Sequence, residues 1–190
     1  MERGERPVEF EGEALLIWGH YRTHPVGLLA VHHTYSPVGP FVEVVAGELA
    51  PTARRWTLAV GPGAPGRPEG AEVATLKWWA GDSLREVIWE ERGLRLQAEA
   101  FRTGVPVSVP VRWLHPGWAD VGGGDRRGDR LHGWLTVARV EVEAPPDDPL
   151  ALFSGRRSGL LFSSVRLAVG GARLLLPRPV RVFPALAEPS

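Results

Sequence analysis

The chain has 190 residues, a length that usually forms one hydrophobic core, so we expect a single domain over residues 1–190. Its 22 basic and 22 acidic side chains cancel, and this balance disfavours a nucleic acid as the partner. The sequence contains no cysteine, which excludes disulfides, thiolate catalysis and cysteine-ligated metal centres.

Alternation of apolar and polar residues with a period of two dominates the sequence and predicts strands. In chain order, strands are expected at residues 13–21, 26–34, 41–47, 56–60, 73–80, 86–91, 93–101, 107–113 and 131–144, and around 165–169 and 180–182. A helix is expected at residues 147–154, and loops at 61–70 and 122–128. Many short strands with little helix predict a mainly β fold built on a curled antiparallel sheet.

The strand expected at residues 131–144 changes its phase. Its apolar residues are odd-numbered at first, as at Leu131 and Val137, and even-numbered later, as at Val140 and Val142. A phase change within one strand indicates an extra residue in the pairing, so we predict a β-bulge near residues 138–139.

The composition of the polar residues is uneven. Lys77 is the one lysine, against 21 arginines, one glutamine and no asparagine, a composition typical of a thermophile or of a GC-rich genome. The first six residues carry both charge signs without a following apolar segment, and no run approaches the length of a membrane span. We therefore expect a cytoplasmic protein that does not bind membranes.

The most informative segment is residues 36–43, Ser-Pro-Val-Gly-Pro-Phe-Val-Glu, between two expected strands. Its two prolines fix φ and its glycine permits a sharp bend, so the connection is stiff. It delivers Glu43 into a strand in which Val42 and Val44 face the other way. A carboxylate held in this manner is suited to acid–base chemistry in a pocket, although a solvent-facing or salt-bridged glutamate fits the same spacing.

Residues 36–43 are similar to the S-P-V-G-P-Y-x-E signature of the acetoacetate decarboxylase-like superfamily. Residues 12–16 and 172–178 resemble the first and last strands of that family, so the resemblance covers most of the chain. It implies a curled antiparallel sheet that closes into a cone-like barrel around a central pocket. It also implies that Glu43 lines the active site and that the chain forms a homo-oligomer.

The chain departs from the family at the catalytic lysine. Decarboxylases of the family carry it in a W-G-x-P-K segment, where it forms a Schiff base with a β-keto acid. Aligning the following tryptophan and acid on Trp89 and Glu90 sets residues 78–82 against that segment and puts Asp82 at the lysine position. Lys77 lies five residues earlier, too far along an extended strand to take its place. A true decarboxylase using Lys77 requires a shifted alignment.

We therefore predict a divergent member of the family that binds a small oxo acid or related metabolite, without a cofactor and without Schiff-base chemistry. Its pocket is expected to be bordered by Tyr35, Glu43 and Asp82, with Trp134 as an apolar wall and Arg130 holding a substrate carboxylate. The alternative is an enzyme in which the carboxylates of Glu43 and Asp82 share acid–base work on a small carbonyl or enol substrate.

Four histidines lie close together in the sequence. His20 and His24 fall on one face of a regular strand, while the neighbours His32 and His33 point to opposite faces of the next one. Three of these histidines, together with the carboxylate of Glu43 or Asp82, would make a divalent-metal site. Ordinary hydrogen-bonded or surface histidines fit the same sequence.

Overall fold

The computed structural model of the chain describes residues 8–36, 39–48, 55–61, 72–100, 104–110 and 130–169. The strands are β1 (Val8–Tyr21), β2 (His24–Tyr35), β3 (Phe41–Glu48), β4 (Arg55–Val60), β5 (Glu72–Val73), β6 (Leu76–Ala80), β7 (Leu84–Trp89), β8 (Leu94–Ala100), β9 (Val105–Pro110), β10 (Arg130–Glu143) and β11 (Gly155–Val169). Two short 3-10 helices accompany them, η1 (Glu90–Arg92) and η3 (Pro149–Phe153). No helix within the described residues is both long and apolar enough to span a membrane.

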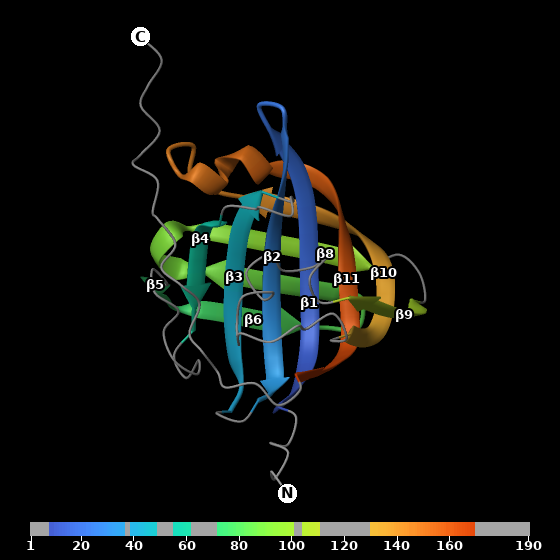
Figure 1. The fold of residues 1–190 in the computed structure, drawn as a ribbon. Coiled ribbons are helices and arrows are strands. Elements are labelled where there is room, and N and C mark those ends of the chain that lie inside the picture. Colours follow the sequence, from blue (N-terminus) through green and yellow to red (C-terminus); the bar gives the residue numbers. More distant parts are fainter. Residues whose placement is uncertain are drawn as a thin grey trace, which may run out of the picture.

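The strands belong to one sheet that curls on itself. Their hydrogen-bonded order is β5-β4-β3-β2-β1-β11-β10-β8-β7-β6, and β9 pairs with the first half of β10. Each pairing is antiparallel except the short one between β4 and β5. In Figure 1, strands β1, β2, β3 and β11 run upright in front, and β6 and β8 cross behind them. This half-barrel confirms the expected mainly β fold with a curled sheet.

An inner apolar cluster fills the space between the two layers. Alternation along β3 places Val42, Val44 and Ala46 in it, while Leu76 and Trp89 enter it from the opposite layer. Burying one such side chain stabilises a fold by about 1.5–3 kcal/mol. The inner cluster therefore holds the sheet in its curled form.

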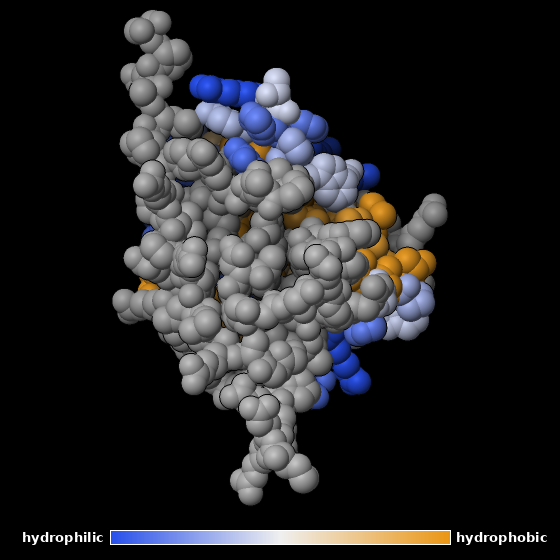
Figure 2. All heavy atoms as spheres, viewed as in Figure 1, coloured by the Kyte–Doolittle hydropathy of each residue, from blue (hydrophilic) through white to orange (hydrophobic). Residues whose placement is uncertain are grey.

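A second apolar cluster lies on the outer face of β1, β2, β10 and β11. Its buried members are Ala14, Leu29, Val31, Leu131, Phe162 and Val165. Val107 and Val109 of β9 pack against it, whereas Val105 and Val137 are 58% and 60% exposed. Apolar side chains are visible on the right flank in Figure 2, where Figure 1 places β9, β10 and β11. The sheet is thus apolar on both faces.

The bulge predicted near residues 138–139 is wrong. The register between β10 and β11 shifts between His132 and Trp134, while residues 138–139 pair regularly with strands on both sides. Leu131 belongs to the outer cluster and Val140 to the inner one. The change of phase arises because one strand is buried on different faces along its length.

Other expected elements differ in extent. The helix expected at residues 147–154 is the shorter η3, and Asp148 caps it by accepting a 2.7 Å hydrogen bond from the backbone N–H of Leu150. The strand expected at residues 73–80 is divided into β5 and β6. Strand β11 begins at Gly155, before any clear alternation in the sequence. The expected strand around 180–182 and most of both expected loops lie outside the described residues.

Strand β1 has an irregular register around Gly12. Its pairing with β2 shifts between Glu11 and Gly12, and its pairing with β11 shifts between Gly12 and Ala14. A Cβ atom on Gly12 would lie 1.9 Å from the backbone oxygen of His32. This position therefore requires glycine, because the backbones of β1 and β2 approach too closely for any side chain.

We expect Gly12→Ala to lower the free energy of unfolding by about 3 kcal/mol, because backbone rather than a flexible side chain would have to move. Gly19→Ala on the same strand is the matched control, since its Cβ would meet the nearest atoms at 3.7 Å, an ordinary contact. Urea denaturation of both variants and the parent measures the difference. Equal stability of the two variants would contradict the close approach.

Candidate functional site

Glu43 and His33 form a buried pair on the outer face of the sheet. The Oε1 atom of Glu43 lies 3.2 Å from Nε2 of His33, and the two residues are 8% and 4% exposed. Since Val42 and Val44 point into the inner cluster, alternation sends Glu43 to the opposite side of β3. The carboxylate of the 36–43 segment thus has an imidazole as its partner.

The turn between β2 and β3 sets the position of this pair. The backbone N–H of Gly39 donates to the oxygen of Ser36 at 3.1 Å, and the Ser36 hydroxyl donates to the oxygen of Gly39 at 2.5 Å. Gly39 has a φ of +101°, a conformation that favours glycine. This closed turn fixes the register in which His33 pairs with Phe41 and brings Glu43 beside it.

Two aromatic rings hold the imidazole of His33 in place. The Phe41 ring stacks on it with 4.2 Å between centroids, and the Phe10 ring meets it edge-on at 5.5 Å. The ring also borders a small hollow lined by Phe10, Glu11, Gly12, Glu13, Ala14, Leu29, Val31, His33, Leu131, Phe162 and Val165. The hollow is small, with a cavity volume of about 20 Å³, and the free space with its open side included is about 450 Å³. A polar pair therefore stands at the edge of an apolar depression.

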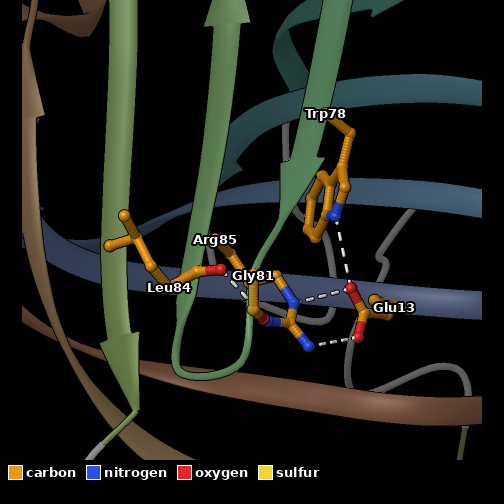
Figure 3. A network of polar contacts seen from close by, with 5 residues as sticks. All are labelled: Glu13, Trp78, Gly81, Leu84 and Arg85. Atoms are coloured by element: carbon orange, nitrogen blue, oxygen red, sulfur yellow. Dashed lines mark hydrogen bonds and ion pairs between the residues drawn. The ribbon is translucent and has the colours of Figure 1, made fainter.

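A second polar cluster occupies the inner side of the sheet, where hairpin β6–β7 approaches β1. The guanidinium of Arg85 donates a hydrogen bond of 2.8 Å to each carboxylate oxygen of Glu13. The indole N–H of Trp78 donates to the same carboxylate at 3.2 Å (Figure 3). Arg85 also donates to the backbone oxygens of Gly81 and Leu84. The guanidinium is thus engaged by its own chain, and it ties the hairpin to β1.

His32 belongs to this inner cluster. Its ring stacks on Trp78 with centroids 5.6 Å apart. Burial lowers the pKa of His32, the charge of Glu13 opposes that shift and the neighbouring His33 adds to it. The adjacent histidines of β2 therefore serve opposite faces of the sheet, as their alternation predicted.

The structure does not bring Glu43 and Asp82 together. Asp82 is exposed between β6 and β7, whose Leu76 and Trp89 side chains face the inner cluster. The side chain of Glu43 projects from β3 away from that cluster, so the front layer of the sheet separates the two carboxylates. Spacing in the sequence could not reveal this, because it depends on which face each strand presents.

Neither Tyr35 nor Trp134 is among the residues that line the hollow. Tyr35 is 55% exposed at the end of β2, and Trp134 is 46% exposed on β10. The side chain of Arg130 lies outside the part of the chain that the structure describes. Their roles in binding stay predictions.

Lys77 lies on the outside of the opposite layer. It is exposed and pairs with Glu90, while its neighbours Leu76 and Trp78 face inward. Lys77 and Glu43 thus point away from the inner cluster in opposite directions. This placement does not favour the alternative in which Lys77 replaces the family's lysine.

The structure does not bring three histidines together as the hypothesis of a metal site requires. His20 and His24 are exposed at the β1–β2 hairpin, and His32 lies eight residues farther along β2, about 26 Å at 3.3 Å per residue. Among the described residues, no group of three or more potential ligands gathers to hold a metal ion. The extended backbone of β2 keeps His32 apart from the two histidines of the hairpin.

Sequence reasoning missed the partners of both clusters. His33 and Glu43 lie on either side of a tight turn and are both odd-numbered. In this hairpin odd-numbered residues pair with odd-numbered ones, so their numbering was an available signal that the two side chains share a face. Glu13 and Arg85 are 72 residues apart, and only the curl of the sheet brings them together.

Comparison with known proteins supports the fold. No protein-family description matches the sequence, and no curated protein matches it. Among solved structures, the chain is similar to the enduracididine biosynthesis enzyme MppR complexed with pyruvate, with a TM-score of 0.50 over 89% of this chain and 90% of that one. MppR has the acetoacetate decarboxylase-like fold. At 12% identity, the likeness shows a shared fold and no more.

The Glu13–Arg85 pair should couple strongly in a double-mutant cycle. Both side chains are less than a fifth exposed, so Glu13→Gln and Arg85→Met should show a coupling free energy of about 1–2 kcal/mol in urea unfolding. The exposed pair Lys77–Glu90 is the control, with an expected coupling below about 0.5 kcal/mol. Equal couplings would contradict the tethering role of Arg85.

The lowered pKa of His32 should make stability depend on pH. Below the ordinary value of 6.5, the unfolded chain takes up a proton that the folded chain resists, so stability present above pH 6.5 is lost as the pH falls toward the lowered pKa. The melting temperature of the parent should fall more between about pH 7.5 and 5.5 than that of His32→Gln. The exposed His24→Gln variant should behave as the parent does, and an unchanged slope in His32→Gln would refute the assignment.

Proposed function

We propose that this protein binds a small oxo acid, or a closely related carboxylate metabolite, in the hollow beside His33 and Glu43. The observation that carries the proposal is the buried imidazole–carboxylate pair at the edge of an apolar depression. The fold supports it, because the similar structure of MppR was solved with pyruvate, a small oxo acid.

The chemistry of the hollow suits such a ligand. Apolar side chains such as Leu29 and Phe162 offer contacts to a short carbon chain. His33 also lines the hollow, and its imidazole is the group that we propose meets the acid end of the ligand. The enclosed space accommodates little more than a water molecule, so the ligand must be short and must extend into the open side of the hollow.

Schiff-base chemistry is not part of the proposal. An iminium needs a primary amine at the bound carbonyl, and the placement of Lys77 on the opposite layer does not provide one beside Glu43. Carboxylate-pair chemistry is likewise not favoured, because Asp82 is exposed between β6 and β7. Self-association and a cytoplasmic location stay predictions.

Pyruvate should raise the melting temperature of the parent protein. At 100 times the dissociation constant, binding to the folded state contributes about 2.7 kcal/mol, which corresponds to roughly 5–10 °C for a domain of this size. His33→Phe keeps an aromatic ring against Phe41 but removes the polar contact, so its shift should vanish. His32→Phe, one residue away on the other face, is the matched control and should retain it.

A screen of short oxo acids that gives no shift in the parent would overturn the proposal. A rise in melting temperature that persists in His33→Phe would show that the ligand binds elsewhere, and it would contradict the proposed site.

Borohydride reduction in the presence of pyruvate tests the absence of an iminium. The mass of the protein should stay unchanged, because no lysine stands at the proposed site. A stable adduct mapped by peptide mass to Lys77 would contradict the proposal and restore the lysine-dependent mechanism.

A further inference from the structure

Strand β6 lies at one end of the sheet. Among the described residues it pairs with β7 alone, and in Figure 1 it lies below β8 in the rear layer. A strand in this position presents a row of backbone N–H and C=O groups to which a further strand can bind. Strand β6 contains no proline, so each of its residues can both donate and accept in such a pairing.

The hydrogen bonds of the β6–β7 hairpin show which residues face the open edge. The backbone N–H of Gly81 donates to the oxygen of Leu84 at 2.9 Å. Bonded and unbonded residue pairs alternate along an antiparallel ladder, so the odd-numbered residues of β6 bond to β7. The backbone groups of Trp78 and Ala80 therefore point away from β7, and no strand among the described residues bonds to them.

The side chains along this edge are open to solvent. Trp79 is 54% exposed, and its neighbours Lys77 and Ala80 are also exposed. Trp79 and Lys77 share the outer face of β6, because Leu76 and Trp78 turn toward the inner cluster. The edge thus carries a large aromatic surface that a further strand would cover.

We infer that a second copy of this chain binds at this edge, with the two β6 strands antiparallel and related by a two-fold axis at Trp79. Trp78 of each copy then lies opposite Ala80 of the other, and these residues exchange backbone hydrogen bonds. The two Trp79 side chains lie opposite each other in a non-hydrogen-bonded position, where side chains of neighbouring strands come closest. The sheet continues from one copy into the other, and the inference does not rest on the proposed function.

Charge complementarity favours a second copy in this orientation as the occupant. The basic Lys77 lies near the start of β6, and the acidic Asp82 follows its end. Antiparallel pairing brings Lys77 of one copy beside Asp82 of the other, twice by symmetry, whereas parallel pairing would bring like charges together. The pairing of Lys77 with Glu90 is an exposed contact of the weak kind, and it does not oppose this arrangement.

The contact is small, so the dimer should be weak. One added strand pair and one aromatic contact bury less than the roughly 1,200 Å² at which specific interfaces of standard size begin. We expect a dissociation constant on the order of 10 μM. Sedimentation equilibrium over a concentration series that brackets this value measures it.

A proline substitution tests the pairing of the edge. Ala80→Pro removes a backbone donor that faces the open edge, so it should abolish the dimer and leave the melting temperature of the monomer close to that of the parent. Lys77→Pro is the matched control on the same strand. It removes a donor that bonds to β7, so it should lower the melting temperature of the monomer.

Side-chain substitutions test the orientation of the two copies. Trp79→Lys places like charges directly opposite each other and should raise the dissociation constant about tenfold or more. Trp18→Lys changes another exposed tryptophan, on β1, and should leave the constant unchanged. Asp82→Lys should weaken the dimer, and Lys77→Asp in the same chain should restore it.

Each other outcome overturns the inference. A parent that stays monomeric throughout the series does so, and a dimer that persists in Ala80→Pro or Trp79→Lys uses a different surface. Loss of the dimer in Trp18→Lys would place the contact on the outer face of β1. A fall in the monomer's melting temperature as large in Ala80→Pro as in Lys77→Pro would show that the edge is paired within one chain. The binding of pyruvate is measured separately, so none of these outcomes bears on the proposed function.

Discussion

Strand β2 carries two adjacent histidines, and the pairing register of β1, β2 and β3 sends them to opposite faces of one sheet. His32 pairs across from Glu13, and His33 pairs across from Gly12 and Phe41. A slip of one residue in this register would exchange the two faces and break both polar clusters. The close approach of backbones at Gly12 and the closed turn before β3 resist such a slip.

The two polar clusters differ in their surroundings. On the inner side, Arg85 satisfies both oxygens of Glu13 and two backbone oxygens, so the cluster joins hairpin β6–β7 to β1 and completes the curl. On the outer side, His33 stands beside an apolar hollow that opens outward. The first arrangement is structural, and the second is the place that we propose for the ligand.

Much of the fold could be predicted from the sequence, because alternation of apolar residues locates strands and the closed turn at Ser36 and Gly39 follows from proline and glycine chemistry. The site could be predicted only in part. Glu43 was identified as a candidate, but its partner was assigned to Asp82 from an alignment that could not show which layer and face each side chain occupies. The contact between Glu13 and Arg85 had no local signal, since it arises from the curl of the whole sheet.

The central proposal is that a small oxo acid binds on the outer face at His33 and Glu43. A crystal structure of the protein grown with pyruvate tests this most directly. We expect pyruvate in the hollow, with one of its oxygens about 2.7–3.2 Å from a ring nitrogen of His33. Pyruvate bound on the inner face or beside Lys77, with the outer hollow empty, would contradict it.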